Sequence, residues 1–409
     1  MSETPARARL FPICQMGGFV LNMVFPHRRD KMILLPLIGS QLIVMTSMFL
    51  MPILIGTLEA YAGLSGKVAG FLLSMELAVC ALTTLCLSAW ARQHSARHWA
   101  LAGGLLAIVG TALTLTSPAL PVLFATRFLA GVGAGVVGAE AMSVLSRGVD
   151  RERLIAILTI ISIVDAAFWL AVLPYLIDRF GYRAPYACLL LICLSGTYLL
   201  MRLPSFSIRQ DATRSALHSP FAISAVLVVL AVFLTQLGQG AFWSMEETYG
   251  SYAGFNRHAI GMILSVATLL LLLGAVGAAW VGNRFGRFTP LLILIAINAL
   301  SILLVSMVAV HWVYVAANVF QSVTNLSSVI YQLGLSASLD RFGRLVAVSA
   351  ALVTLGNGLG PGLSASLSGV LGAQFIGVLV LGLNALALGL YCTVMLRGAG
   401  ETQLSVSMT

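Results

Sequence analysis

The sequence predicts an all-α membrane protein in which twelve spanning helices form two pseudo-symmetric six-helix bundles. Three observations predict this fold: the composition, the number of apolar segments and an internal repeat. Of the 409 residues, 59% are hydrophobic and 9% are charged, whereas soluble domains carry about 25% charged residues. A chain this poor in charge cannot cover a water-exposed surface, and a disordered chain needs the opposite balance. The bilayer is therefore the predicted solvent.

The predicted elements are twelve apolar segments bounded by charged residues, glycine or proline. A helix needs about 20 apolar residues to cross the hydrocarbon core. A transmembrane barrel would instead show alternating segments of about ten residues. The predicted spans are 33–57, 68–90, 99–117, 120–145, 154–177, 185–203, 220–245, 259–281, 289–309, 312–337, 345–369 and 372–396.

An internal repeat divides these spans into two sets of six. The hexapeptide AGFLLS at 69–74 resembles IGMILS at 260–265, which lies 191 residues later. Two related bundles with a site between them, near the bilayer midplane, are typical of secondary transporters. The predicted organisation is an N-terminal cytoplasmic extension (1–32), a first bundle (33–203), a central cytoplasmic loop (204–219), a second bundle (220–396) and a cytoplasmic tail (397–409).

The basic residues predict the orientation. With the N-terminus inside, eighteen lysines and arginines fall on the cytoplasmic side, and four fall outside: Lys67, Arg179, Arg183 and Arg257. This asymmetry follows the positive-inside rule and predicts an inner-membrane protein with both termini in the cytoplasm. The net charge is +9, but the basic residues are spread along the chain, so no nucleic-acid partner is expected.

Several loops and glycine-rich turns resemble elements of the major facilitator superfamily. The loop after the eighth span reads AWVGNRFGR (279–287), and the fourth span contains RFLAGVGAG (127–135). The resemblance extends over about 33–396 and implies twelve spans that rock about a central cavity. Asn283 stands where the family carries an acid, and this loop latches the two halves in the family. The gating and motif residues that the resemblance implies are Asn283, Arg284, Gly286, Arg287, Gly131 and Gly133. Gly360 and Pro361, in span eleven, are further gating candidates because a proline there frees a backbone carbonyl and permits a hinge.

Ionisable residues within predicted spans are candidates for proton coupling, because burying a charge in the bilayer is costly. The candidates are Asp165, Arg127 and Glu76. Burial raises the pKa of a carboxyl and a nearby arginine lowers it, so we expect Asp165 to exchange protons if Arg127 lies near it. On this hypothesis, Asp165→Asn abolishes uphill transport. The alternative is that these residues form structural pairs. Glu246 and Glu247, at the outer end of span seven, are expected to be solvated, and the alternative is that they are gate residues.

Polar side chains in spans that otherwise face lipid predict a cavity, because bare amides in hydrocarbon are costly. In span ten, Asn318, Ser322, Asn325 and Gln332 share one helical face. The alternative is that they bond neighbouring helices. The candidate substrate-cavity residues are Gln41, Gln236, Gln239, Trp243, Asn318, Ser322, Asn325 and Asn357.

These features predict a secondary transporter, without enzymatic activity, that moves a small organic solute by alternating access. We expect it to be monomeric and proton-coupled, with export favoured over import. One alternative is uptake of a small organic anion, such as an aromatic or carboxylic acid, with Arg127 as counter-charge. Another is a membrane sensor that binds a ligand without moving it. The six cysteines and six histidines show no metal-ligand spacing, and no phosphate-binding loop occurs. No metal or cofactor is therefore expected.

Overall fold

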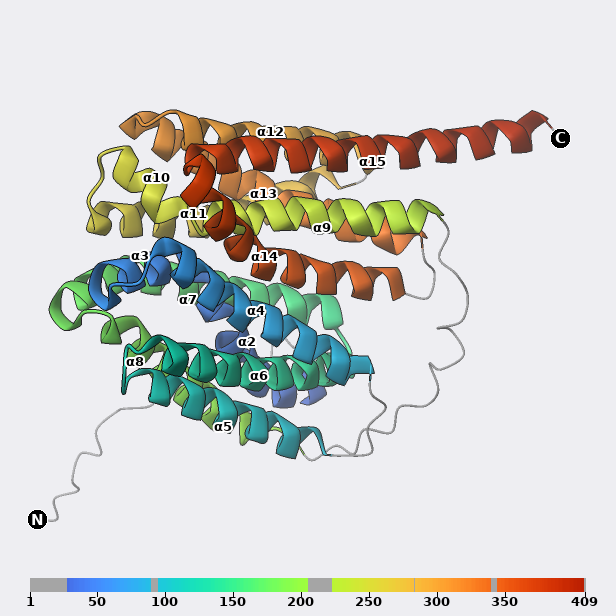
Figure 1. The fold of residues 1–409 in the computed structure, drawn as a ribbon. Helices are drawn as coiled ribbons and strands as arrows, with labels where there is room; N and C mark the ends of the chain where they lie inside the picture. Colours follow the sequence, from blue (N-terminus) through green and yellow to red (C-terminus); the bar gives the residue numbers. More distant parts are fainter. Residues whose placement is uncertain (1–27, 90–94, 205–222, 283, 340–343, 408–409) are drawn as a thin grey trace, which may run out of the picture.

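The computed structural model describes residues 28–89, 95–204, 223–282, 284–339 and 344–407, and all the regular elements in this part of the chain are α-helices (Figure 1). The first half contains α2 (Arg28–Phe49), α3 (Met51–Ala62), α4 (Gly66–Ala89), α5 (Ala96–Thr114), α6 (Leu120–Leu145), α7 (Arg151–Phe180) and α8 (Arg183–Leu200). The second half contains α9 (Ile223–Trp243), α10 (Glu246–Tyr252), α11 (Arg257–Val281), α12 (Phe288–Met307), α13 (His311–Leu339), α14 (Arg344–Leu371) and α15 (Gln374–Ser407).

Nine of these helices, α4 to α8 and α11 to α14, begin and end within three residues of the predicted spans. Eleven of the described helices are long and apolar enough to cross a membrane. The other long helix, α13, has 29 residues but a lower hydropathy, because it carries the polar side chains that predicted a cavity. The all-α membrane fold predicted from composition and hydropathy is therefore confirmed, and α13 is the one long helix of the described residues that is not among the eleven candidate spans.

The first predicted span, 33–57, differs from the structure. Helix α2 already begins at Arg28, and Asp30 accepts hydrogen bonds from the backbone N–H groups of Val149 and Asp150 at 2.9 and 3.1 Å. Residues 28–32 are thus helical and tied to the loop between α6 and α7. The helix is interrupted at Leu50 and continues as α3, because Pro52 has no N–H to donate to the preceding turn.

The second half also departs from prediction at two ends. The seventh span was expected to end at 245, but α9 stops at Trp243 and a separate short helix, α10, follows. The tail was expected to start at 397, but α15 continues as helix to Ser407 and projects beyond its neighbours in Figure 1. The central loop 204–219 lies, apart from Pro204, outside the described residues, as do residues 1–27 of the extension.

The two halves pack against each other through two pairs of helices. Helix α4 lies along α14, and α7 lies along α11, whereas the other main helix contacts stay within one half. In Figure 1 the first half (blue to green) and the second half (yellow to red) accordingly form two adjacent layers of helices.

Close helix packing inside the first half depends on glycine. A Cβ atom at Gly131 would lie 2.5 Å from the carbonyl oxygen of Glu76, so α6 and α4 approach too closely for a side chain there. Gly133, on the other side of α6, faces the backbone of α5 in the same way. These glycines hold α6 between α4 and α5, and this position places Arg127 in the interior of the bundle.

Candidate functional site

A cavity of about 320 Å³ lies between the two halves. Helices α2 and α7 line it from the first half, and α9, α11, α13 and α14 line it from the second. Its polar lining residues are Gln41, Thr159, Ser162, Gln236, Gln239, Thr268, Gln321, Ser322, Asn325 and Asn357, and Trp243, Phe49 and aliphatic and methionine side chains complete the wall. No charged side chain is among the residues described as lining it.

One wall of this cavity is a chain of hydrogen-bonded amides. Asn357 on α14 donates to the side-chain oxygen of Gln236 on α9 at 2.9 Å. Gln236 in turn donates to Gln332 on α13 at 3.4 Å, and Gln332 donates to the hydroxyl of Thr235 at 3.0 Å. The network fixes the side chains of three helices at the cavity wall. Preorganised polar groups on a mostly apolar surface are typical of small-molecule sites.

Gln239 and Trp243 lie one turn apart at the end of the cavity nearer α10. The side-chain oxygen of Gln239 is buried and has no hydrogen-bond partner among the described residues, so it is free to accept a hydrogen bond from a solute. The indole N–H of Trp243 donates to the carbonyl oxygen of Phe49 on α2 at 3.2 Å. This bond joins the two halves directly beside the cavity.

Seven of the eight candidate cavity residues line this space: Gln41, Gln236, Gln239, Trp243, Ser322, Asn325 and Asn357. Asn318 does not. Its side chain lies nearer the start of α13, where it contacts the carboxylate of Glu246 at 3.4 Å. Four further polar residues line the cavity but were not among the predicted cavity residues: Gln321, Thr159, Ser162 and Thr268. For Gln321 a signal was present, since it lies four residues before Asn325 and so shares its face.

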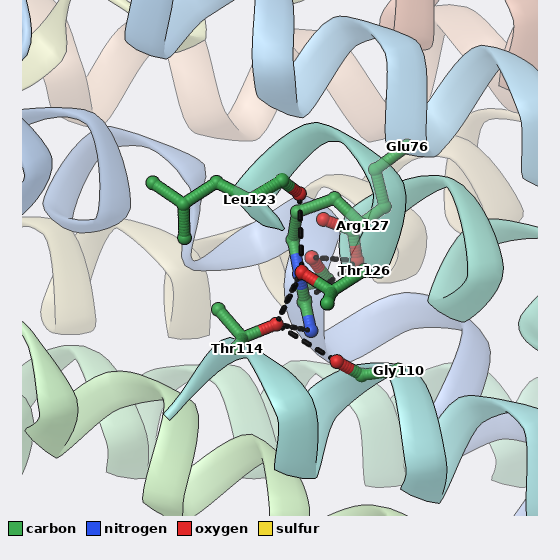
Figure 2. Close-up of polar contacts among 7 residues, drawn as sticks. Glu76, Gly110, Thr114, Leu123, Thr126 and Arg127 are labelled. Carbon is green, nitrogen blue, oxygen red and sulfur yellow. Dashed lines mark hydrogen bonds and ion pairs between the residues drawn. The ribbon is translucent and has the colours of Figure 1, made fainter. Parts of the chain in front are cut away.

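Arg127 is 1% exposed and lies inside the first half (Figure 2). Its Nε and Nη2 atoms donate to the hydroxyl of Thr114 on α5 at 3.1 and 2.8 Å, and Nη1 forms an ion pair with Glu76 on α4 at 3.4 Å. The guanidinium also lies 5.0 Å from the ring centre of Tyr186. Ser47 on α2 donates to the same carboxylate of Glu76 at 3.2 Å. The arrangement joins four helices of one half around a compensated charge pair.

Asp165 does not meet Arg127. Its carboxylate accepts hydrogen bonds from the hydroxyl of Thr46 on α2 at 2.8 Å and from the indole N–H of Trp169 at 3.1 Å. It is half-buried and is not among the lining residues of the cavity. The expectation that Arg127 tunes Asp165 directly is therefore corrected: Arg127 pairs with Glu76, because its place on α6 points it toward α4 and α5.

One end of the cavity is closed by contacts between the halves. Ser74 on α4 donates to the carbonyl oxygen of Gly358 on α14 at 2.6 Å, and Ser265 on α11 donates to that of Ala167 on α7 at 2.6 Å. Beyond them, the imidazole of His258 lies 3.1 Å from the carboxylate of Asp178, again between α11 and α7. This closed end carries the short helices α3 and α10.

The two glutamates of α10 lie at this closed end, and the expectation that they are solvated is wrong. Glu246 is fully buried, and Glu247 forms an ion pair with Arg257 on α11 at 2.9 Å and faces Gly56 of α3. Burial raises the pKa of both carboxyls. The sequence placed them at the end of a span, but the chain turns back into the bundle as α10 and buries them.

The predicted latch loop between α11 and α12 is described except for Asn283, which lies outside the described residues. Gly286 adopts a φ of +72°, which favours glycine. Arg284 lies over the ring of Trp280 at 5.3 Å. Arg287 donates to the carbonyl oxygen of Gly334 near the end of α13 at 2.6 Å, a contact within the second half.

The glycine–proline element of α14 lies inside a continuous helix that faces α9 and α4. Gly360 packs against the backbone of Ala241 on α9. Pro361 cannot donate to the carbonyl oxygen of Asn357, one turn earlier, which leaves that oxygen without its helical partner beside the cavity wall.

Comparisons with known proteins agree with this architecture. A family model described as Major Facilitator Superfamily matches residues 37–229. A search of curated proteins finds no match. Among solved structures, a transporter of the POT family in complex with 5-aminolevulinic acid superposes with a TM-score of 0.70 at 14% identity, covering 91% of this chain and 96% of the other.

Two further structures have the same fold. A bacterial homolog of the human lysosomal transporter Spinster, in an inward-facing and unoccupied conformation, gives a TM-score of 0.67 at 14% identity over 90% of this chain and 96% of that one. The human organic anion transporter MFSD10 (TETRAN) gives 0.64 at 15% identity over 89% of this chain and 100% of that one. The family model matches just under half of the chain, and the solved structures, at 14–15% identity, show that the chain shares their fold.

Proposed function

We propose that this protein is a secondary active transporter that moves a small organic solute across the inner membrane by alternating access. The observation that supports this most is the amide-lined cavity between the halves, closed at the α3–α10 end by bonds between the halves. A binding cavity that opens to only one side at a time is what an alternating-access cycle requires.

The closed end is proposed to face outward. Helix α2 starts beside the loop between α6 and α7, where the Asp30 carboxylate accepts a hydrogen bond from the backbone N–H of Val149. Helix α7 runs from that loop to the closed end, where Asp178 lies. The start of α15 is also at the closed end, since Ala373 accepts a hydrogen bond from Tyr249 of α10. Both the start of α2 and the end of α15 therefore lie at the opposite end, which the basic residues assign to the cytoplasm.

The solute is proposed to be an uncharged or zwitterionic molecule with several hydrogen-bonding groups and an apolar part. Amides and hydroxyls supply donors and acceptors, while Trp243, Phe49 and the methionines supply apolar surface. An organic anion held by Arg127 is less consistent with the structure, because Arg127 is buried against Glu76 and Thr114 and does not line the cavity.

Proton coupling is part of the proposal. The contacts of Glu76 and of Asp165 support structural roles for both, since each carboxylate is held by partners within the first half. Glu246, at the closed end, has no charged partner among the described residues.

The test is accumulation of solutes by the purified full-length protein in liposomes under an imposed pH gradient, screened over neutral, zwitterionic and anionic organic compounds. We expect concentrative accumulation of at least one compound that collapses when a protonophore is added. Gln239→Leu should raise the KM for that compound, while Gly382→Ala, at an open position on α15, should leave KM unchanged. Saturable binding without flux would instead indicate a membrane sensor, and would contradict the proposal.

A further inference from the structure

The two halves place different side chains at the same helical position. Arg127 is the eighth residue of α6 and Asn318 is the eighth residue of α13, and the two are 191 residues apart, as are the repeated hexapeptides. Each contacts a buried glutamate: Arg127 contacts Glu76 at 3.4 Å, and Asn318 contacts Glu246 at 3.4 Å. The first pair is charge-compensated and the second is not.

Glu246 has an environment that disfavours a carboxylate. It is 0% exposed, and in the described part of the chain it forms no salt bridge. Helix α10 packs into an apolar cluster that includes Phe242, Tyr249 and Tyr314. The Oε2 atom has Asn318 as its partner, and the Oε1 atom is buried without a hydrogen-bond partner among the described residues. A buried charge without a counter-charge is strongly unfavourable, so such a group takes up a proton instead.

Building on the proposed transport function, we infer that Glu246 is the proton-binding carboxyl of this protein, and that closing the α3–α10 end takes up a proton at its side chain. In the closed state the neutral carboxyl fits the uncompensated site. When the closed end opens and α10 moves out of this apolar cluster, water reaches the carboxyl and favours the ionised form. Proton binding therefore favours closure, and loss of the proton favours opening, by linkage.

The direction in which the pKa of Glu246 is shifted agrees with this geometry. Burial raises the pKa of Glu246 to about 8, against the opposing effects of Tyr314 and Asn318. By contrast, Glu247, the next residue, has Arg257 at 2.9 Å as its counter-charge. Other titratable or charged groups lie on α10 and on the parts of α3, α11 and α13 near it. They are Glu247, Tyr249 and Tyr252 on α10, Glu59 and Tyr61 on α3, Arg257 and His258 at the start of α11, and His311 and Tyr314 at the start of α13.

Infrared spectroscopy of the purified full-length protein in phosphatidylcholine liposomes tests this assignment without any solute. The wild type should show a C=O band of a buried protonated carboxyl that disappears as the pH is raised through about 8. Glu246→Gln should lack this band, and Glu247→Gln and Glu76→Gln should keep it. Asn318→Arg, which copies the arrangement of the first half, should also remove it, because a guanidinium beside Glu246 favours the carboxylate.

A second measurement follows the closed end itself. Nitroxide labels on Ala60→Cys of α3 and Ser251→Cys of α10, both exposed positions, report the distance between the halves in a cysteine-free background. The short-distance population should decrease above about pH 8 in the wild type and should not depend on pH in Glu246→Gln. Because Gln copies the neutral carboxyl, this variant is expected to fold and to remain closed.

A band that persists in Glu246→Gln, or a wild type without a titrating carboxyl, would overturn the inference even if solutes accumulate. If the band behaves as expected but no solute accumulates, the proposed transport function fails and the proton site stands. The two failures are thus separated by the choice of measurement.

Discussion

Arg127 on α6 and Glu76 on α4 form an ion pair at 3.4 Å inside the first half, where the arginine side chain is 1% exposed and the glutamate side chain 9%. Thr114 receives two further hydrogen bonds from the guanidinium, and Ser47 bonds to the same Glu76 oxygen. The pair joins α2, α4, α5 and α6, so we assign it a structural role in keeping the first half rigid while it moves relative to the second.

Removing one member of this pair should cost more stability than removing both. Arg127→Gln leaves the Glu76 carboxylate buried without a counter-charge, which costs about 3–5 kcal/mol. Arg127→Gln combined with Glu76→Gln replaces two charges by neutral amides and should recover part of this loss. The measurement is a double-mutant cycle of thermal unfolding on purified full-length protein. Additive effects of the two single variants would show that no coupling exists.

Asp165→Asn distinguishes the sequence-based expectation from the structural one. The carboxylate accepts bonds from Thr46 and Trp169, and an asparagine keeps one acceptor oxygen but turns an N–H group toward a donor. We expect a loss of about 1 kcal/mol of stability from the missing hydrogen bond and preserved uphill transport. The sequence alone predicted that uphill transport is abolished. If it is lost in a well-folded Asp165→Asn variant, Asp165 regains its place as the coupling residue.

Gly131→Ala should destabilise the first half because its Cβ would approach the Glu76 carbonyl oxygen to 2.5 Å. Separating α6 from α4 costs about 1–3 kcal/mol by overpacking and weakens the Arg127–Glu76 pair. Gly382→Ala, where a Cβ meets no atom within 4 Å, is the matched control and should be neutral or slightly stabilising. Thermal unfolding measures both, and equal midpoints for the two variants would contradict the packing argument.

Hydropathy was sufficient to predict the helices, because a chain in lipid must satisfy its backbone hydrogen bonds within helices. It could not predict the interruption at Leu50, where Pro52 acts locally, or the helical continuation of α15 past Arg397. The polar spacing in α13 predicted Ser322 and Asn325 at the cavity, since amides in an apolar helix need a polar environment.

Pairings between distant residues were not predictable from one sequence. Which acid Arg127 meets depends on how α6 is rotated against α4 and α7, and spacing along the chain does not contain that rotation. Asn318 shares a face with Ser322 but lies about one turn nearer the start of α13, so it reaches Glu246 and not the cavity. The burial of Glu246 and Glu247 depends on α10 turning back into the bundle, for which the sequence carried no signal that we could identify.

A reversible cross-link at the closed end tests most directly whether the two halves move relative to each other. A Cβ atom at Gly362 on α14 would lie 3.3 Å from the Cβ of Ser74 on α4, close to the separation of about 3.5–4.5 Å found in disulfides. Gly104 and Thr197, both in the first half, offer a matched pair with a Cβ separation of 3.2 Å.

The measurement is uptake, in liposomes, of a solute that the wild type accumulates, with each cysteine pair in a cysteine-free background. Oxidised Ser74→Cys/Gly362→Cys should lose at least nine-tenths of its uptake and should regain it on reduction. A tenfold loss corresponds to about 1.4 kcal/mol. Oxidised Gly104→Cys/Thr197→Cys should keep its uptake. Undiminished uptake with the halves fully cross-linked at Ser74 and Gly362 would contradict alternating access.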